Sequence, residues 1–388
     1  MDKTLAQRLQ TISPFYVMAL LHRAKELAAQ GRDVIHMEVG EPDFPTPQPI
    51  VDAAINLIKT GEVKYTSAAG LPQLRQKIAD YYQHTYGVSI KPQQVFITPG
   101  ASGALLLAFG IALNPGQNLL MSDPCYPCNR NFASLYGADT IAIPVTAESG
   151  YQLTAALIHQ HWTNNSNGVL LASPSNPTGT VIADAQLQAA VAATHALGGY
   201  FYADEIYHGL TYGQTASSAL QYSDEVFVIN SFSKYFGMTG WRIGWLIVPE
   251  VMIESAEKLA QTLFIATGTA SQYAALAAFS AETLVELERR REVLAERRDF
   301  LYDSLLRLGF KVAVKPEGAF YIYADCSQFT DDSFQFAADF LEAEAVAVTP
   351  GKDFGSHDAE KYLRFAYTTS IARMAEAMER LERFIQCR

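Results

Sequence analysis

The sequence predicts an α/β protein in which a large domain, built on a mostly parallel sheet flanked by helices, is joined to a smaller α+β domain. The chain has 388 residues, more than a single hydrophobic core usually organises. From about residue 95 to residue 248, short apolar segments alternate with turns and helical stretches, which is typical of parallel strands connected by helices. After Phe279 a long, charged helical pattern begins, which indicates a second unit.

Seven short apolar segments in the central part of the chain predict strands. They are residues 95–98, 118–122, 140–145, 168–173, 200–203, 225–230 and 243–248. The clearest helix between them spans residues 184–197, is rich in alanine, and is expected to have Asp184 as its N-cap and to stop at Gly198 and Gly199. We assign residues 46–281 to the large domain that this sheet organises.

The C-terminal part of the chain predicts a different arrangement, which opens with a long helix over residues 282–308. Opposite charges at helical spacing, Glu286 with Arg290 and Glu288 with Arg291, support this helix. Strands are predicted at residues 311–314, 319–324 and 362–366, and helices at residues 333–344 and 371–384. A helix near residues 17–30 is expected to pack against them, so residues 1–45 and 282–388 are predicted to form the small domain.

The composition excludes several classes of partner. Hydrophobic residues make up 49% of the chain and charged residues 18%, as in globular proteins. The net charge of -11 opposes binding to nucleic acids and to anionic membranes. Residues 104–113 form the longest apolar run, which is too short to span a bilayer, and the N-terminus shows no secretory pattern. Four cysteines in this length fit a reducing compartment, so we expect a cytoplasmic protein.

Polar side chains follow three of the predicted strands. Asn176, Asp204 and Lys234 each come at or just after a strand end, at intervals of about one strand–helix–strand unit. Taken singly, such residues are more often turn, cap or solvated residues. Because ligands of parallel sheets bind at the carboxyl ends of the strands, the three together predict one shared crevice.

Pyridoxal phosphate is a ligand that needs this combination of groups. Its aldehyde condenses with a lysine, its ring nitrogen stays protonated beside a carboxylate, and its phenolate oxygen accepts hydrogen bonds. Residues 98–103, Thr-Pro-Gly-Ala-Ser-Gly, connect a strand to an apolar helix, where backbone N–H groups bind phosphate. Further phosphate donors are expected from Ser231, Ser233 and Arg242, and the ring of Tyr126 is of the right kind to stack on the pyridine ring.

Taken in order, these segments resemble the fold type I pyridoxal-phosphate aminotransferases of class I and II, close to the aspartate aminotransferase group. The resemblance covers nearly the whole chain. The segments that carry it are 40–44 (Gly-Glu-Pro-Asp-Phe), 64–66 (Lys-Tyr-Thr), 98–103, 175–179 (Ser-Asn-Pro-Thr-Gly), 203–207 (Ala-Asp-Glu-Ile-Tyr), 231–234 (Ser-Phe-Ser-Lys), 240–244 (Gly-Trp-Arg-Ile-Gly) and 363–365 (Leu-Arg-Phe). It implies an aminotransferase that moves the α-amino group of an amino acid to a 2-oxo acid in a ping-pong reaction.

The resemblance also implies a role for each site residue. Lys234 forms the internal aldimine and shuttles a proton between the substrate α-carbon and the cofactor C4′. Asp204 holds the proton on the ring nitrogen, and Asn176 and Tyr207 hydrogen-bond the phenolate oxygen. Arg364 binds the substrate α-carboxylate. Residues implied to contact the phosphate or to complete the substrate site are Ala101, Ser102, Ser231, Ser233, Arg242, Tyr65 from a neighbouring subunit, and the backbone of Gly40 beside Arg364. The resemblance also implies a homodimer in which each active site includes residues of both subunits.

Two departures bear on the substrate. Aspartate-specific members of this subgroup carry a lysine where this chain has Ser102, and no arginine lies between Arg242 and Arg289 to meet a side-chain carboxylate. Both argue against an enzyme restricted to dicarboxylates and favour neutral donors, with 2-oxoglutarate still open as an acceptor. A β-eliminating lyase or decarboxylase on the same fold is an alternative, and a non-catalytic regulator is disfavoured because no basic DNA-binding module is present. No metal is required, and Cys125-x-x-Cys128 is interpreted as incidental thiols.

Overall fold

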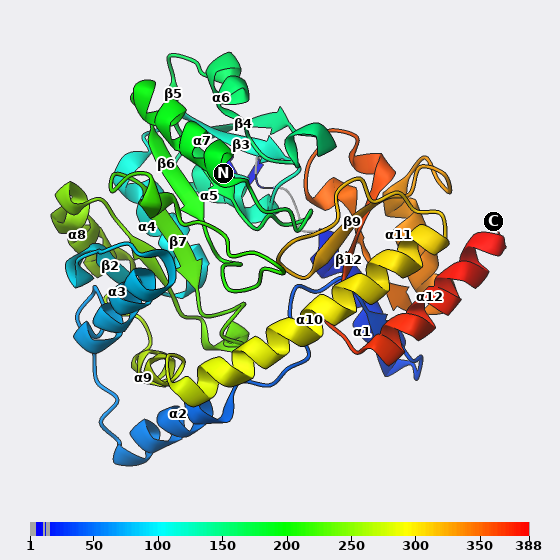
Figure 1. Cartoon of the computed structure of the whole chain (residues 1–388), viewed down its shortest axis with the longest axis horizontal. Coiled ribbons are helices and arrows are strands. Elements are labelled where there is room, and N and C mark those ends of the chain that lie inside the picture. The colour runs from blue at the N-terminus through cyan, green and yellow to red at the C-terminus, as the bar shows by residue number, and fades with distance from the viewer. Residues whose placement is uncertain (1–4, 11, 13–15, 388) are drawn as a thin grey trace, which may run out of the picture.

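The computed structural model describes residues 5–10, 12 and 16–387, and a seven-stranded sheet organises most of it (Figure 1). The strand order is β2-β8-β7-β6-β5-β3-β4. β8 runs antiparallel to both of its neighbours, and the other neighbouring pairs are parallel. The strands are β2 (Val95–Thr98), β3 (Asn118–Asp123), β4 (Asp139–Pro144), β5 (Ser166–Ala172), β6 (Tyr200–Asp204), β7 (Phe227–Ser231) and β8 (Gly244–Ile247). All seven predicted strands are therefore confirmed, with ends that differ by one or two residues.

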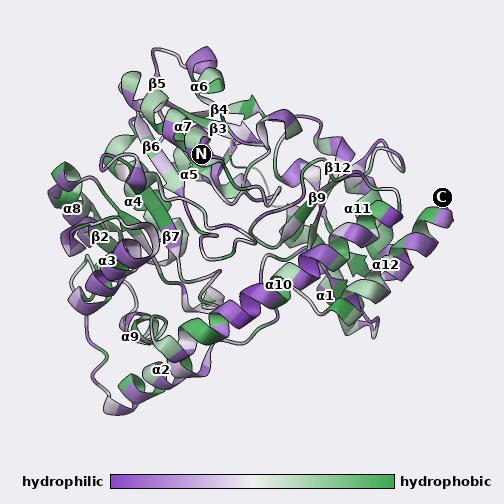
Figure 2. Cartoon of the chain, in the orientation of Figure 1, coloured by the Kyte–Doolittle hydropathy of each residue, from purple (hydrophilic) through white to green (hydrophobic). Residues whose placement is uncertain are grey.

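Helices cover both faces of this sheet because its central strands are apolar on both sides. Every residue of β2, β7 and β8 is buried. One face packs against α4, whose side chains are almost all apolar, and against α8. The helices of this part are α2 (Gln48–Thr60), α3 (Pro72–Tyr86), α4 (Gly100–Ala112), α5 (Pro127–Leu135), α6 (Ala155–His161), α7 (Asp184–Ala196), α8 (Ile253–Phe264) and α9 (Thr269–Ala277). Figure 2 shows the hydrophobic colouring concentrated where these helices meet the strands.

The predicted N-cap of α7 is wrong. The residue before the helix is Ala183, and Asp184 is already its first residue. The Asp184 carboxylate instead accepts a hydrogen bond from Ser217 Oγ at 2.7 Å. The side chain that the local pattern predicts to cap the helix therefore makes a tertiary contact instead.

The second unit contains a three-stranded antiparallel sheet in the order β11-β12-β9 and a short parallel pair, β1 with β10. Its strands are β1 (Ile35–His36), β9 (Tyr321–Asp325), β10 (Val346–Ala347), β11 (Thr349–Pro350) and β12 (Tyr362–Ala366). α1 (Tyr16–Ala29), α11 (Ser333–Glu344) and α12 (Ile371–Gln386) surround them, as predicted. The strand predicted at residues 311–314 is wrong, because only Lys311 forms a bridge, to Asp325. Pro316 follows closely and has no N–H with which to continue a ladder.

The long helix α10 (Ala281–Arg307) runs from one unit to the other (Figure 1). Ser280 caps it by accepting a hydrogen bond from the Thr283 backbone N–H. Both predicted ion pairs form, with Arg290 Nε 2.7 Å from Glu286 and Arg291 Nε 2.8 Å from Glu288. None of the three sheets in the described residues combines strands from both predicted domains, and the boundaries near residues 46 and 281 stay a prediction.

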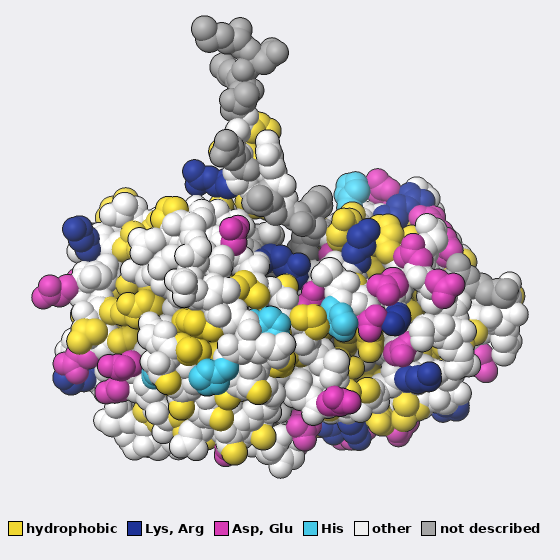
Figure 3. All heavy atoms as spheres, turned by 90° about the horizontal axis from the view of Figure 1, so that it is seen from above, with side chains coloured by type: hydrophobic (Ala, Val, Ile, Leu, Met, Phe, Trp, Pro, Cys, Tyr) yellow, Lys and Arg dark blue, Asp and Glu magenta, His cyan; other side chains and the backbone are white. Residues whose placement is uncertain are grey.

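The surface carries charges of both signs. On the face shown in Figure 3, acidic and basic side chains are interspersed. Within the described part of the chain, no helix combines the length and the apolar character needed to cross a membrane.

Candidate active site

A cavity of about 240 Å³ at the carboxyl ends of the parallel strands brings most of the predicted site residues together. β5, β6 and β7 are neighbours in the sheet and run in the same direction, so their C-terminal ends emerge at one edge. The predicted residues that line the cavity are Gly40, Ala101, Ser102, Tyr126, Asn176, Asp204, Tyr207, Ser233, Lys234, Arg242 and Arg364.

Two predicted site residues do not line this cavity. Ser231 lies behind Ser233, where its Oγ is 2.9 Å from Ser233 Oγ and 3.1 Å from the Ile243 carbonyl oxygen. Tyr65 lies between α2 and α3 with 84% of its surface exposed. Their contacts with the phosphate, for Tyr65 from a neighbouring subunit, stay predictions. The sequence also predicts that residues 12–16 line the substrate pocket, and this segment falls largely outside the described residues.

Lys234 is half-buried, and its ammonium group contacts mainly neutral partners. Its Nζ donates a hydrogen bond to the carbonyl oxygen of Gly40 at 2.8 Å and lies 5.9 Å from the ring centre of Tyr207. Burial lowers the pKa of Lys234 to about 8, and the charges of Arg364 and Arg242 act in the same direction. An amine with this pKa loses its proton far more easily than an exposed lysine, as a nucleophile or base requires.

Asp204 ends β6 and presents its carboxylate to the cavity. Its Oδ1 accepts a hydrogen bond from the Ile206 backbone N–H at 3.2 Å. Burial raises the pKa of Asp204 to about 6, and the neighbouring Glu205 carboxylate raises it further, whereas the hydrogen bond from the Ile206 N–H lowers it. At neutral pH the carboxylate is therefore mostly ionised and suits a protonated ring nitrogen.

The N-terminus of α4 and the guanidinium of Arg242 form a cradle for an anion. Ala101 and Ser102 lie in the first turn of α4, where backbone N–H groups have no partners within the helix. The guanidinium of Arg242 lies over Gly100, so that a Cβ built on this glycine would be 2.6 Å from Arg242 Nη2. Ser233 lines the cavity beside them. Glycine at position 100 therefore leaves room for the arginine.

Arg364, on β12, is held between two aromatic rings. Its Cζ lies 4.2 Å from the ring centre of Tyr321 and 4.8 Å from that of Phe354. Its Nη1 donates to Asn176 Oδ1 at 2.9 Å, and its Nη2 donates to Thr349 Oγ1 at 3.1 Å and to the carbonyl oxygen of Glu38. These contacts fix the plane of the guanidinium.

Several buried polar atoms of residues around the cavity have no hydrogen-bond partner in the described part of the chain. They are Arg364 Nε, both amide atoms of Asn129, and Glu38 Oε2. Unpaired buried polar atoms are costly, and in native proteins they mark places where a ligand or water binds. Together with the lysine, the carboxylate and the anion cradle, they fit pyridoxal phosphate with a carboxylate substrate beside it.

The structure adds residues that the sequence reasoning missed. Asn129 follows Tyr126 by three positions, a helical spacing that places both on the cavity side and was available as a signal. Tyr321 gave no signal, because it belongs to a segment with the pattern of a buried core, and Phe354 gave none, because it is a single apolar residue in a polar turn. Val17, Met18 and Leu21 of α1 also line the cavity, and nothing local distinguishes them from other apolar helix positions.

Glu205 is a second buried carboxyl group that was missed. Its carboxylate accepts hydrogen bonds from Ser218 Oγ at 2.8 Å, from the Ala219 N–H at 3.0 Å and from Tyr82 Oη at 3.1 Å. Burial raises the pKa of Glu205 to about 7. It ties the segment after β6 to α3, on the side of the strand away from the cavity.

The Cys125-x-x-Cys128 pair lies beside Tyr126, and both residues are free thiols. Cys125 is buried and Cys128 is half-buried, and burial raises the pKa of each. A raised pKa disfavours the reactive thiolate, in agreement with the interpretation that these thiols are incidental.

Comparison with known proteins extends over almost the whole chain. The family model described as aminotransferase class I and II matches residues 32–381. A valine–pyruvate aminotransferase of Mycobacterium tuberculosis is 37% identical over 95% of this chain and 96% of its own length. An aspartate aminotransferase of Bacillus sp. strain YM-2 is 36% identical over the full length of both chains. The crystal structure of an aminotransferase from Mycobacterium tuberculosis superposes with a TM-score of 0.96, at 36% identity, over all of both chains.

Proposed function

The chain belongs to the class I and II aminotransferases, which depend on pyridoxal phosphate, and within this family we propose that it takes the amino group of a neutral, aliphatic amino acid. The 2-oxo acid that accepts the amino group is then also one with an uncharged side chain, because the same pocket serves both half-reactions. The observation that carries this proposal is the distribution of charge in the cavity.

Each cationic side chain that lines the cavity is already assigned to the cofactor or to the substrate α-carboxylate. Among the described lining residues the cations are Lys234, Arg242 and Arg364. The proposed roles of these three are cofactor attachment, phosphate binding and binding of the α-carboxylate. A second carboxylate on the substrate side chain would find Ser102 rather than a cation at the position already noted. Burying a carboxylate without a cation is unfavourable, so dicarboxylates are poor donors.

The wall formed by α1 and its neighbours supports an aliphatic side chain. Val17, Met18 and Leu21 come from α1, and Leu105 and Phe132 come from α4 and α5. Such a surface stabilises apolar groups by about 25 cal/mol per Å² removed from water. The relatives include enzymes named for valine with pyruvate and for aspartate, and the apolar wall of this chain favours the first type.

We propose that the charged side chains orient the substrate and move its proton. Arg364 binds the α-carboxylate, aided by its fixed plane and its unpartnered Nε. Lys234, once deprotonated, takes the proton from the substrate α-carbon and returns it later in the cycle. Its pKa of about 8 supports this role, because the free amine is then accessible near neutral pH.

The remaining polar residues hold the cofactor in the state that assists proton removal. When bound, pyridoxal phosphate supplies a conjugated ring that delocalises the electron pair left on the α-carbon. Asp204 keeps the proton on the ring nitrogen, while Tyr207 and Asn176 donate to the phenolate oxygen. The first turn of α4, Ser233 and Arg242 hold the phosphate, and the ring of Tyr126 stacks on the pyridine ring.

The half-reaction with single amino acids tests the proposed donor class. The purified holoenzyme is mixed with alanine, valine or aspartate, and the cofactor absorbance is followed as the amine form appears. We expect alanine or valine to convert the cofactor at least ten times faster than aspartate, because burying an unpaired carboxylate costs more than the roughly 1.4 kcal/mol that a tenfold difference requires. Equal or faster conversion by aspartate would refute the proposal.

The β-eliminating lyase remains the competing activity on the same residues. A lyase releases pyruvate and ammonia from a suitable amino acid without a 2-oxo acid acceptor. We expect no such release from serine or cysteine at rates comparable with transamination. Release of pyruvate and ammonia at the rate of transamination would show that the protein is a lyase rather than the proposed aminotransferase.

We further propose that the protein acts as a homodimer in the cytoplasm. Large apolar side chains are exposed on and near α2, α8 and α9, among them Ile58 at 59%, Val63 at 48% and Ile265 at 61%. Tyr65, 84% exposed, lies in the same region, where it can reach a neighbouring copy. The four free cysteines support a reducing compartment. Sedimentation of the purified protein at twice the monomer mass is expected, and a monomeric active enzyme would contradict the shared site.

A further inference from the structure

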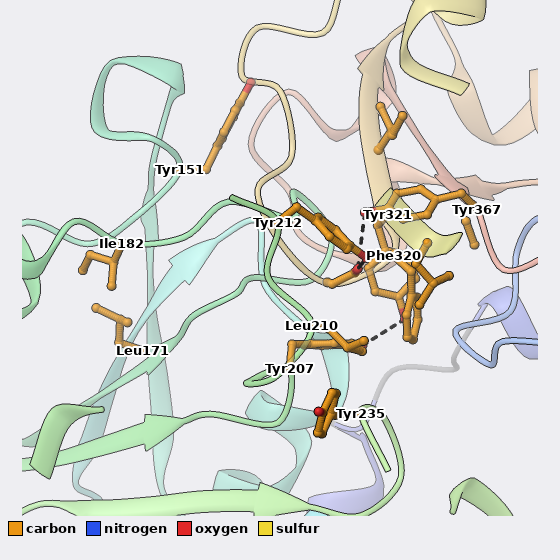
Figure 4. Close-up of a cluster of buried hydrophobic side chains, with 14 of the residues drawn as sticks. Tyr151, Leu171, Ile182, Tyr207, Leu210, Tyr212, Tyr235, Phe320, Tyr321 and Tyr367 are labelled. Atoms are coloured by element: carbon orange, nitrogen blue, oxygen red, sulfur yellow. Dashed lines mark hydrogen bonds between the residues drawn. The ribbon is translucent and has the colours of Figure 1, made fainter. Parts of the chain in front are cut away.

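Tyr321 lies where three parts of the active site meet. It begins β9, is buried with 1% of its surface exposed, and lines the cavity. Its Oη is 2.9 Å from the Oη of Tyr207, and its ring faces the guanidinium of Arg364 at 4.2 Å. Gly40 packs so closely against it that a Cβ on this glycine would overlap the Tyr321 hydroxyl. Figure 4 shows Tyr207, Phe320 and Tyr321 within one cluster of buried side chains.

We propose that Tyr321 is a positioning residue that donates its hydroxyl proton to Tyr207, and thereby links the carboxylate-binding Arg364 to the hydroxyl that faces the cofactor. This inference rests on the proposed function, in which Arg364 binds the substrate carboxylate and Tyr207 donates to the phenolate oxygen. Tyr321 itself makes no bond to the reacting atoms.

The direction of the hydrogen bond follows from proton counting. A tyrosine hydroxyl has one proton and two lone pairs. If Tyr207 donates its proton into the cavity, its oxygen is free to accept, and the Tyr321 hydroxyl is the donor within reach. A hydroxyl that accepts a hydrogen bond becomes a stronger donor, so Tyr321 strengthens the donation by Tyr207.

The surroundings of the two hydroxyls support this direction. Burial raises the pKa of both tyrosines, and raises that of Tyr207 well above its ordinary value. For Tyr321, the charge of Arg364, whose guanidinium lies over its ring, lowers the pKa again. The more acidic hydroxyl of a pair is the better donor, which is Tyr321 here. The cation that lies on its ring therefore promotes the same hydrogen bond.

The Tyr321→Phe variant tests the inference, because it keeps the ring under Arg364 and removes only the hydroxyl. Tyr212→Phe is the matched control. Tyr212 belongs to the same buried cluster and donates to the Ala319 carbonyl oxygen at 2.5 Å, but it does not line the cavity. Both variants are loaded with pyridoxal phosphate, and the pH midpoint of the cofactor absorbance is measured.

We expect Tyr321→Phe to raise this midpoint by about half a pH unit, less than Tyr207→Phe does. A weaker donor leaves more negative charge on the phenolate oxygen, so the Lys234 nitrogen that joins the cofactor holds its proton to higher pH. The other titratable groups that face Tyr207 and Tyr321, namely Lys234, Arg364 and Tyr126, are unchanged in the variant. Tyr212→Phe should leave the midpoint where it is in the wild type.

A kinetic comparison separates the hydroxyl from the ring. We expect Tyr321→Phe to lower kcat several-fold while KM for the amino acid stays within about twofold. Tyr321→Leu removes the ring from Arg364 and should also raise KM. An unchanged midpoint in Tyr321→Phe, or an equal shift in Tyr212→Phe, would overturn the inference. Failure of the proposed function would appear separately, in the donor panel of the wild-type enzyme.

Discussion

The carboxyl groups of Asp204 and Glu205 are neighbours in the chain but serve opposite sides of the end of β6. Asp204 lines the cavity, whereas Glu205 accepts hydrogen bonds from Tyr82 and Ser218 on the far side. Burial raises the pKa of Asp204 to about 6 and that of Glu205 to about 7. The first carboxylate faces the cavity, and the second anchors the segment that carries Tyr207.

Replacing Asp204 by asparagine should leave the fold intact and lower kcat at least about 100-fold. The amide keeps the size of the side chain but carries no charge to hold a proton on the ring nitrogen. Single-turnover rates with the best donor, compared with circular dichroism of the same sample, check this prediction. Wild-type turnover in this variant would remove Asp204 from its proposed role.

Lys234→Ala should still bind pyridoxal phosphate, but without a covalent link. The anion cradle at α4 and Arg242 is untouched in this variant, whereas the amine proposed to attach the cofactor and to move the substrate proton is lost. We expect turnover to fall by about 10⁴-fold. Borohydride treatment followed by peptide mass analysis should find the cofactor on residue 234 in the wild type and on no peptide in the variant.

Glu205→Gln should change the pH dependence of stability. The pKa of Glu205 is raised by burial from 4.5 to about 7, so between these values the unfolded chain loses a proton that the folded protein keeps. Stability from this group is therefore full below about pH 4.5 and falls as the pH rises toward 7. The shift corresponds to at most about 3 kcal/mol.

The glutamine variant should escape this loss, because its amide stays neutral and still pairs with Tyr82 and Ser218. Denaturant unfolding at pH 5 and pH 8 measures the difference. We expect the free energy of unfolding of the variant, relative to that of the wild type, to increase from pH 5 to pH 8. Glu205→Ala, which leaves the partners unpaired, should be less stable than wild type at both. A pH-independent difference between Glu205→Gln and the wild type would show that Glu205 is ionised throughout.

Arg364→Lys should weaken substrate binding more than it slows the chemistry. Lysine keeps the charge but cannot bond Asn176 and Thr349 while it meets a carboxylate in two places. We expect KM for the amino acid to rise at least about tenfold, with a smaller change in kcat. The Kd of an unreactive carboxylate, followed through the cofactor absorbance, should rise by a similar factor. Unchanged affinity would assign the α-carboxylate to another residue.

Ser102→Lys should broaden the donor range toward aspartate. Ser102 lines the cavity, and a lysine there supplies the cation that the wild-type pocket lacks for a second carboxylate. We expect the ratio of kcat/KM for aspartate to that for valine to rise at least about tenfold. Ser102→Met, of similar length but uncharged, is the control. A similar rise in the methionine variant would show that space rather than charge excludes aspartate.

Much of the fold was accessible to sequence reasoning because it depends on local patterns. Residues 362–366 and 333–344 were predicted as strand and helix and form β12 and α11 over those residues. Two local predictions were wrong, one because a tertiary partner took the side chain and one because a nearby proline prevents a longer ladder. Asp184 was expected to cap α7 but bonds Ser217, and residues 311–314 were expected to form a strand but pair only at Lys311.

The sequence by itself determined the position of Asn176, Asp204 and Lys234, because side chains that follow neighbouring parallel strands must emerge at one edge of the sheet. It also determined the part of the anion cradle that the first turn of α4 provides, because that part lies within one strand–turn–helix segment, whereas Arg242 reaches it from a distant part of the chain. Tertiary structure alone decided that Tyr321 and Phe354 enclose Arg364 and that Glu205 faces away from the cavity. Tyr82 lies 123 positions from Glu205 in the chain, and the two rings reach Arg364 from another strand and from a turn, so no local pattern encodes these contacts.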